Sequence, residues 1–286
     1  MIEAILDYAF MRNALLAAVL ASIAGGIIGT IAIEKKLISM SGGIAHASFG
    51  GIGLGYLLGF EPIIGGLAFA VGISALIAKI PPNTRMKADT MTGILWSFGM
   101  ALGILFIALR PGYMPDMTSY LFGDILSVST QSLVLMAVFT GTLVLVFTMF
   151  FNHMALYLFD EEYAAAAGIK TSVLKWITYI IIPVGIIVLL RIVGILLTIA
   201  LMTIPVSVAK MFFRSFGRVI IFSIVFSLLF CLAGLTASYY INIPSGVCII
   251  VLSTAVYLVL LLLRGGASKW LHQIKKHAEP AKPVNR

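Results

Sequence analysis

Residues 219–240 read VIIFSIVFSLLFCLAGLTASYY, an apolar run without a single charged side chain. A helix needs about 20 apolar residues to cross the roughly 30 Å hydrocarbon core of a bilayer. The whole chain of 286 residues shares this composition, being 61% hydrophobic and 10% charged, whereas soluble domains carry about 25% charged residues. The sequence therefore predicts an all-α, polytopic integral membrane protein.

The number of similar runs sets the number of spans. The region 176–209 is too long for one span and short for two, and Arg191 interrupts it. Because a charge near the middle of a membrane is costly, we expect a broken or re-entrant helical hairpin with Arg191 at its turn. The sequence predicts eight or nine membrane-spanning helices. The candidate runs besides 219–240 are 14–33, 42–59, 62–80, 91–109, 132–151, 176–190, 192–209 and 247–263.

The distribution of basic residues predicts the orientation. If the polar, basic tail 264–286 is cytoplasmic, only Arg12, Arg110 and Arg191 of the 19 Lys and Arg residues lie outside, as the positive-inside rule favours. With nine crossings the N-terminus is then outside. We expect residues 1–263 to form one transmembrane domain and the tail to fray. Since the net charge of +8 comes from loops and tail, a nucleic-acid partner is not expected.

His46 is the one ionisable side chain that lies well inside a predicted span. At 100° per residue, Gly42, His46, Gly50 and Gly53 share one helix face, and the glycines let a second backbone or a pore lie beside the imidazole. Neutral imidazole is a good ligand for divalent transition metals. A histidine that makes a single interhelical hydrogen bond explains the residue equally well, so both interpretations stay open.

The loop 152–175 contains a second candidate feature, a short helix at 160–168. An aspartate at its start is a favoured N-cap, acidic residues suit the first turn, alanines propagate the helix, and a glycine can end it. The segment is either a simple connection or a docking helix whose small side chains let a partner approach closely. The docking interpretation rests on Asp160, Glu161, Glu162, Ala164, Ala165 and Gly168.

Several chemical motifs are absent from the sequence. No GxxxxGK[ST] loop for nucleotide phosphates, no HExxH and no GxSxG occurs in the chain, and each of these supports a specific chemistry. Cys231 and Cys248 lie in apolar runs and are expected to be small core residues rather than a metal site. We therefore assign no catalytic residue and expect a transport protein rather than an enzyme.

Five stretches together resemble a known family over residues 10–263. They are SGGIAHASFGGIGLGYLLG at 41–59, RIVGILLTIALMTIPVSVA at 191–209, RSFGR at 214–218, SYY at 238–240 and PSG at 244–246. In this order they resemble the permease subunit of ABC importers for divalent transition metals, the zinc, manganese and iron uptake family.

The resemblance implies a multi-pass protein of the cytoplasmic membrane that works as a homodimer around one pathway. It implies a cytoplasmic ATPase partner that uses ATP, an extracytoplasmic metal-binding protein, and no resident cofactor in this chain. It also implies that 160–168 is the helix coupled to the ATPase and that His46 is a metal ligand in the pathway.

The sequence departs from the family at one position of this site. The family usually has an aspartate four residues before the histidine, and here that position is Gly42. Asp124 is a candidate to supply the missing carboxylate. A site without carboxylates leans away from Mn²⁺ towards Zn²⁺ or Fe²⁺, or towards a chelated metal. A secondary transporter driven by an ion gradient and a membrane-embedded enzyme remain the alternatives.

Overall fold

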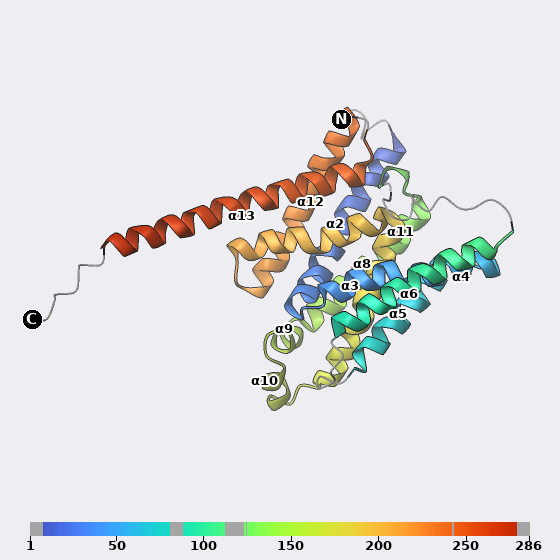
Figure 1. Ribbon diagram of the computed structural model, residues 1–286, viewed down its shortest axis with the longest axis horizontal. Helices are drawn as coiled ribbons and strands as arrows, with labels where there is room; N and C mark the ends of the chain where they lie inside the picture. The colour runs from blue at the N-terminus through green and yellow to red at the C-terminus, as the bar shows by residue number, and fades with distance from the viewer. Residues whose placement is uncertain (1–7, 81–87, 112–122, 124, 242, 279–286) are drawn as a thin grey trace, which may run out of the picture.

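The computed structural model describes residues 8–80, 88–111, 123, 125–241 and 243–278, with the backbone alone for Ala88 and 265–278. This part of the chain is helical and contains no strand (Figure 1). Its elements in chain order are α2 Ala9–Glu34, α3 Ile38–Ala47, α4 Phe49–Leu58, α5 Pro62–Ala78, α6 Ala88–Leu109, the 3₁₀ turn η1 Ile125–Ser127, α8 Thr130–Met149, α9 Phe151–Phe159, α10 Glu161–Ala166, α11 Thr171–Phe212, α12 Phe216–Ile241 and α13 Ser245–Ala278.

Length and composition identify 6 candidate membrane spans among the described residues, in α2, α6, α8, α11, α12 and α13. The all-helical membrane fold is thus confirmed, whereas the count of eight or nine spans is not. The difference has a structural cause. The predicted run 42–59 is split between α3 and α4, α5 has 17 residues, and the runs 176–190 and 192–209 belong to one long helix.

That long helix, α11, has 42 residues and would be about 60 Å long if straight, roughly twice the hydrocarbon core. Gly194 interrupts it with φ 78° and ψ 169°, so α11 has two arms, 171–193 and 195–212. Figure 1 shows them leaving a sharp bend in different directions. The expected turn at Arg191 is therefore wrong, because the helix continues through Arg191 and bends at the glycine, which tolerates positive φ.

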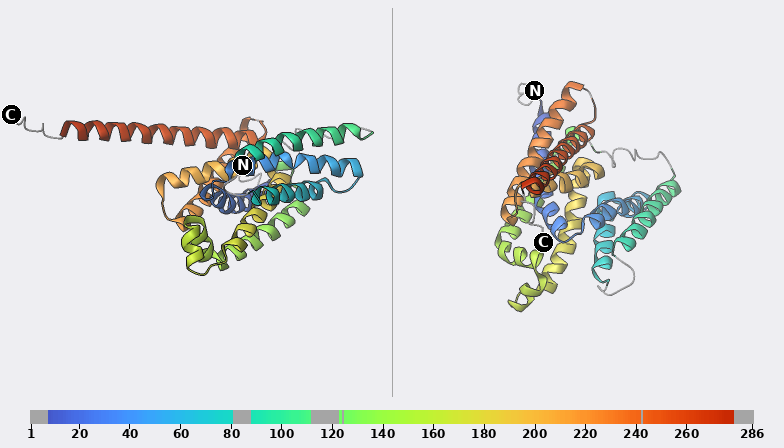
Figure 2. Two further views of the ribbon diagram at one scale, coloured as in Figure 1. Left: turned by 60° about the horizontal axis from the view of Figure 1, so that its bottom comes forward. Right: turned by 60° about the vertical axis from the view of Figure 1, so that its left-hand side comes forward.

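The C-terminal tail also differs from the prediction. α13 continues as a helix to Ala278, well past the apolar part that ends at Arg264, so the tail does not fray from residue 264. The extension begins with two glycines, which are poor helix formers, but alanine, leucine, lysine and glutamine, which are good ones, follow them and favour its helical backbone. In Figures 1 and 2 α13 projects away from the rest of the molecule.

Glycines hold the helices close together. A Cβ at Gly29 of α2 would lie 2.1 Å from the carbonyl oxygen of Met202, so α2 and the second arm of α11 touch backbone to backbone. A Cβ at Gly99 of α6 would lie 2.4 Å from the carbonyl oxygen of Ala47, which sets the same kind of contact between α6 and α3. Such small-residue contacts are typical of helices packed in lipid. Figure 2 shows α3 to α6 gathered on one side of the molecule.

Candidate functional site

His46 lies one residue before the end of α3 and is partly buried. Its Nδ1 is 2.9 Å from the carbonyl oxygen of Gly42. Because a carbonyl only accepts, Nδ1 carries the proton and donates; in the neutral imidazole Nε2 is then the nitrogen with the lone pair that a metal ion requires. The imidazole stacks on the indole of Trp96 in α6, with ring centroids 4.5 Å apart and planes at 28°. The hydrogen bond and the stacking together fix the orientation of the imidazole.

Two residues after the histidine, a one-residue break at Ser48 separates two helices, although the backbone of Ser48 itself keeps helical angles, φ −59° and ψ −19°. α3 ends at Ala47 and α4 begins at Phe49, and the buried Ser48 between them donates its hydroxyl to the carbonyl oxygen of Ala45 at 2.7 Å. Hydroxyl groups that bond back to the preceding turn often bend helices. The close approach of Gly99 to Ala47 brings α6 against this break and places Trp96 beside His46. Sequence reasoning missed Trp96, whose position in the run 91–109 gives no periodic signal.

The predicted common face of the glycines is only partly correct. Gly50 and Gly53 do face α6, since a Cβ at Gly53 would lie 2.5 Å from the carbonyl oxygen of Gly103. Gly42 instead faces α11, where the nearest atom to a Cβ would be Cδ1 of Ile199 at 3.9 Å. Position 42, where the resembled family has its aspartate, therefore lies between α3 and the second arm of α11 and has room for a Cβ atom.

The described residues hold no complete metal site within one chain. Among them no group of three or more His, Cys, Asp or Glu side chains lies close enough to bind an ion. Asp124, the other predicted candidate, lies outside the described residues. A single imidazole is a weak ligand set, so metal binding at His46 needs further ligands from a second copy or from the cargo itself.

The short helix predicted at 160–168 is present as α10. Oδ1 of Asp160 accepts a hydrogen bond from the backbone N–H of Tyr163 at 2.8 Å, which caps the first turn as predicted, and Gly168 follows the helix with φ 82°. Ala164 is fully buried and fixes the helix to the protein. The other residues assigned to docking, Glu161, Glu162, Ala165 and Gly168, are exposed together with Tyr163.

An ion pair ties α10 to the end of α2. Nζ of Lys35 lies 2.9 Å from Oε2 of Glu161 and 3.5 Å from the ring centroid of Tyr157 in α9, a favourable cation–π distance. Burial, and then the charge of Glu161, raise the pKa of Tyr157 above its ordinary value, so the phenol stays neutral. The adjacent Glu34 pairs with Lys210 of α11 at 2.8 Å. In the sequence, the only indication of these pairs is that the charged residues Glu34 and Lys35 directly follow the apolar run 14–33.

A second set of contacts lies at the bend of α11. Arg191 pairs with Glu61, the residue before α5, at 3.6 Å. Gly123, with φ 62°, lies so close that a Cβ there would be 2.2 Å from the backbone of Val193. Arg191 was expected at the outer interface, and the structure adds Glu61 as its partner.

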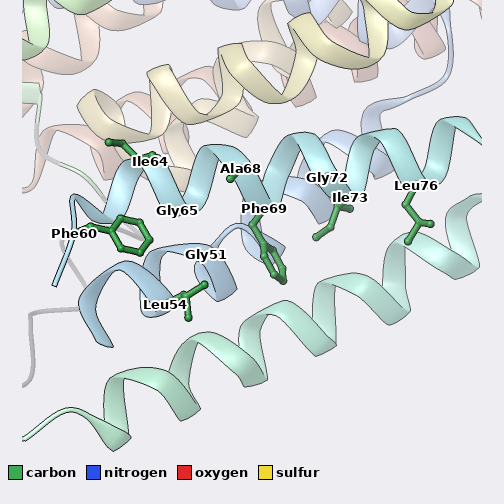
Figure 3. A pocket seen from close by; sticks show the side chains of 10 residues that line it. All are labelled: Gly51, Leu54, Phe60, Ile64, Gly65, Ala68, Phe69, Gly72, Ile73 and Leu76. Carbon is green, nitrogen blue, oxygen red and sulfur yellow. The ribbon is translucent and has the colours of Figure 1, made fainter. Parts of the chain in front are cut away.

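An apolar groove of about 440 Å³ runs along α4 and α5, and Figure 3 shows the side chains that line it. Its lining is hydrophobic or glycine throughout, with Phe60, Ile64 and Phe69 among its side chains. None of the lining residues has a side chain that binds a metal ion, so this groove is not a candidate metal site.

Comparison with known proteins adds a family to this geometry. The chain matches the ABC 3 transport family over residues 7–264. The membrane protein slr2045 of Synechocystis sp. is 34% identical over 267 residues, which cover 92% of this chain and 95% of that protein. The manganese import system permease protein ScaB of Streptococcus parasanguinis is 27% identical over 276 residues, 96% of this chain and 98% of ScaB.

A solved structure has the same fold. A chain of PsaBC from Streptococcus pneumoniae, determined in complex with a Fab, superposes with a TM-score of 0.80 at 26% identity. The match covers 90% of this chain and 93% of that chain.

Proposed function

Because this chain belongs to the ABC 3 transport family, whose relatives here are membrane permeases rather than enzymes, we propose that it carries a divalent transition-metal ion into the cell. The observation that carries the proposal is the orientation of His46. Its Nδ1 donates to the carbonyl of Gly42 at 2.9 Å, so that in the neutral ring Nε2 is the nitrogen with a lone pair for a metal.

The proposed transporter is a homodimer with one pathway between its two copies. Two His46 side chains, one from each copy, offer two imidazole nitrogens to a passing ion, and Asp124 is a candidate for an added carboxylate. Few ligands bind weakly, which suits a site that must release its cargo. A cytoplasmic ATPase supplies the energy and an extracytoplasmic binding protein delivers the metal.

The proposed contact with the ATPase is the exposed face of α10. The helix is capped by Asp160 and anchored by the buried Ala164. On its exposed face the side chain of Ala165 is small, so the surface of a partner protein can come close to the helix. Tyr163, which is 60% exposed, adds an apolar surface beside it.

The proposed cargo is manganese, zinc or iron. The name of ScaB favours manganese, whereas the missing carboxylate at Gly42 favours the softer zinc and iron ions. Measuring how manganese, zinc and iron compete for uptake decides which of the three ions the protein prefers.

The proposed topology has residues 1–263 as one permease domain and 264–286 as a cytoplasmic tail. It counts α3 with α4 as one crossing and each arm of α11 as one crossing, so that the chain crosses the membrane nine times. With an odd number of crossings and a cytoplasmic tail, the N-terminus is outside. In this arrangement the pairs Lys35–Glu161 and Glu34–Lys210 lie on the side assigned to the cytoplasm, and the pair Arg191–Glu61 lies on the side assigned to the outside.

The decisive experiment is co-expression of the chain with its candidate ATPase, followed by co-purification and by uptake of radioactive manganese, zinc or iron. We expect uptake only when the ATPase is present and able to hydrolyse ATP. Uptake that needs no ATPase but collapses with the proton gradient would instead identify a secondary transporter.

A further inference from the structure

Two adjacent residues at the end of α2 form ion pairs with two different helices. Lys35 reaches Glu161 of α10 at 2.9 Å, and Glu34 reaches Lys210 at the end of α11 at 2.8 Å. The same short segment of α2 therefore holds both the candidate docking helix and the second arm of α11.

The two central side chains are much less exposed than their partners. The side chain of Glu34 is 13% exposed and that of Lys35 is 16% exposed, whereas Glu161 is 52% and Lys210 is 39% exposed. Charges withdrawn from water interact more strongly and are costly to separate. The Tyr157 ring beneath Lys35 holds the ammonium further. The centre of this arrangement is thus fixed, and only its outer partners face water.

Backbone packing continues the connection beyond the ion pairs. α2 and the second arm of α11 touch at Gly29 and Met202 without intervening side chains, so the two helices are packed backbone to backbone at this point. The same arm carries Ile199, the nearest neighbour of Gly42, and Gly42 accepts the hydrogen bond of His46.

We propose that Glu34 and Lys35 are positioning residues that transmit the movement of α10 to the second arm of α11 and so to position 42 beside His46. The proposal rests on the proposed function of α10 as the contact with the ATPase. When the ATPase displaces α10, the pair Glu161–Lys35 carries α2 with it, and the pair Glu34–Lys210 together with the Gly29 contact carries α11. Without these pairs the movement of α10 reaches the second arm of α11 less completely, and ATP hydrolysis is partly uncoupled from transport.

The test breaks each pair and measures assembly and coupling separately. In Lys35→Gln and in Lys210→Gln we expect normal co-purification of the ATPase and continued ATP hydrolysis, with metal uptake per ATP reduced about fivefold or more, the size of a typical coupling energy. Lys36→Gln is the matched control. Lys36 is exposed and makes no ion pair with the other described residues, so its uptake per ATP should be unchanged.

A charge reversal separates coupling from misfolding. Lys35→Glu and Glu161→Lys should each uncouple transport alone, and the double variant should regain most of the lost uptake, because the pair is rebuilt with opposite polarity. Lys210→Gln lies away from α10 and tests the second pair even if variants at Lys35 fold poorly.

The possible results distinguish this proposal from the function on which it rests. If the wild-type chain transports metal with its ATPase and Lys35→Gln and Lys210→Gln keep full uptake per ATP, the proposed link is wrong while the transport function stands. If Lys35→Gln loses the ATPase altogether, Lys35 supports docking and not transmission, which also overturns the link. If the wild-type chain never assembles with an ATPase, the proposed function itself fails.

Discussion

Gly123 lies directly against the backbone of Gly194 at the bend of α11. A Cβ at Gly123 would be 2.2 Å from the carbonyl carbon of Val193 and 2.4 Å from the backbone nitrogen of Gly194. Both glycines have positive φ, 62° and 78°. The connection between α6 and α8 thus has at least one residue, Gly123, fitted into the bend, and this contact leaves no room for a side chain.

The first prediction follows from this contact. Gly123→Ala should destabilise the protein by about 1–3 kcal/mol, because alanine is strained at positive φ and its methyl group would overlap the backbone of α11. Thermal unfolding in detergent measures the loss. Gly141→Ala is the control, since it lies inside α8 with no atom within 4 Å of the new Cβ and should not destabilise. Equal melting temperatures for both variants would contradict the prediction.

Hydropathy predicted the membrane fold because apolar length is a local property of the sequence. Every predicted run except 42–59, which is divided between α3 and α4, lies within or largely within one helix, including 14–33 in α2 and 219–240 in α12. The local structure of α10 was also predictable, since the cap at Asp160 and the left-handed Gly168 depend on residues only a few positions apart.

Features that depend on contacts between distant residues were not predictable from one sequence. The bend of α11 could have been at Pro183, Arg191 or Gly194, and the contact with Gly123 shows why it lies at the glycine. The stacking of His46 on Trp96 and the pairing of Lys35 with Glu161 join residues from different helices. No periodicity within one helix encodes such partners.

The second prediction concerns docking. Ala165→Trp should prevent co-purification of the ATPase, because a bulky side chain on the exposed small face of α10 would hold the partner's surface away. The permease itself should stay folded, since Ala165 is exposed while Ala164 carries the packing. Ala137→Trp, at an exposed position of α8, is the matched control and should assemble normally. Full recovery of the ATPase with Ala165→Trp would rule out α10 as the contact.

The third prediction concerns orientation. In a background without Cys231 and Cys248, a cysteine at position 268 should resist impermeant thiol reagents in intact cells and one at position 119 should react. The reason is the positive-inside rule, which leaves only Arg12, Arg110 and Arg191 outside. Labelling with and without permeabilisation measures both positions. The reverse pattern would overturn the orientation and, with it, the docking of an ATPase at α10.

The fourth prediction concerns Gly42. Gly42→Asp should be tolerated, because the new Cβ meets only Ile199 at 3.9 Å. The added carboxylate lies one turn from His46 and should tighten metal retention and shift the preference towards Mn²⁺, which favours oxygen ligands more than Zn²⁺ does. Elemental analysis of the purified complex measures the bound metal. Gly42→Asn has a similar shape without the charge, and an equal shift in that variant would show that charge is not the cause.

The last prediction separates the two interpretations of His46. As a metal ligand, His46 should be needed for its nitrogen, so both His46→Ala and His46→Gln should lower metal uptake by about tenfold or more while expression and ATPase assembly stay normal. As a structural residue, it should be needed for its hydrogen bond to Gly42 and its stacking on Trp96. Glutamine can donate to the Gly42 carbonyl but is a much poorer ligand for transition metals. Trp96→Phe keeps an aromatic surface for stacking and should retain uptake. If His46→Gln transports metal normally, the imidazole is structural and Asp124 becomes the next residue to test.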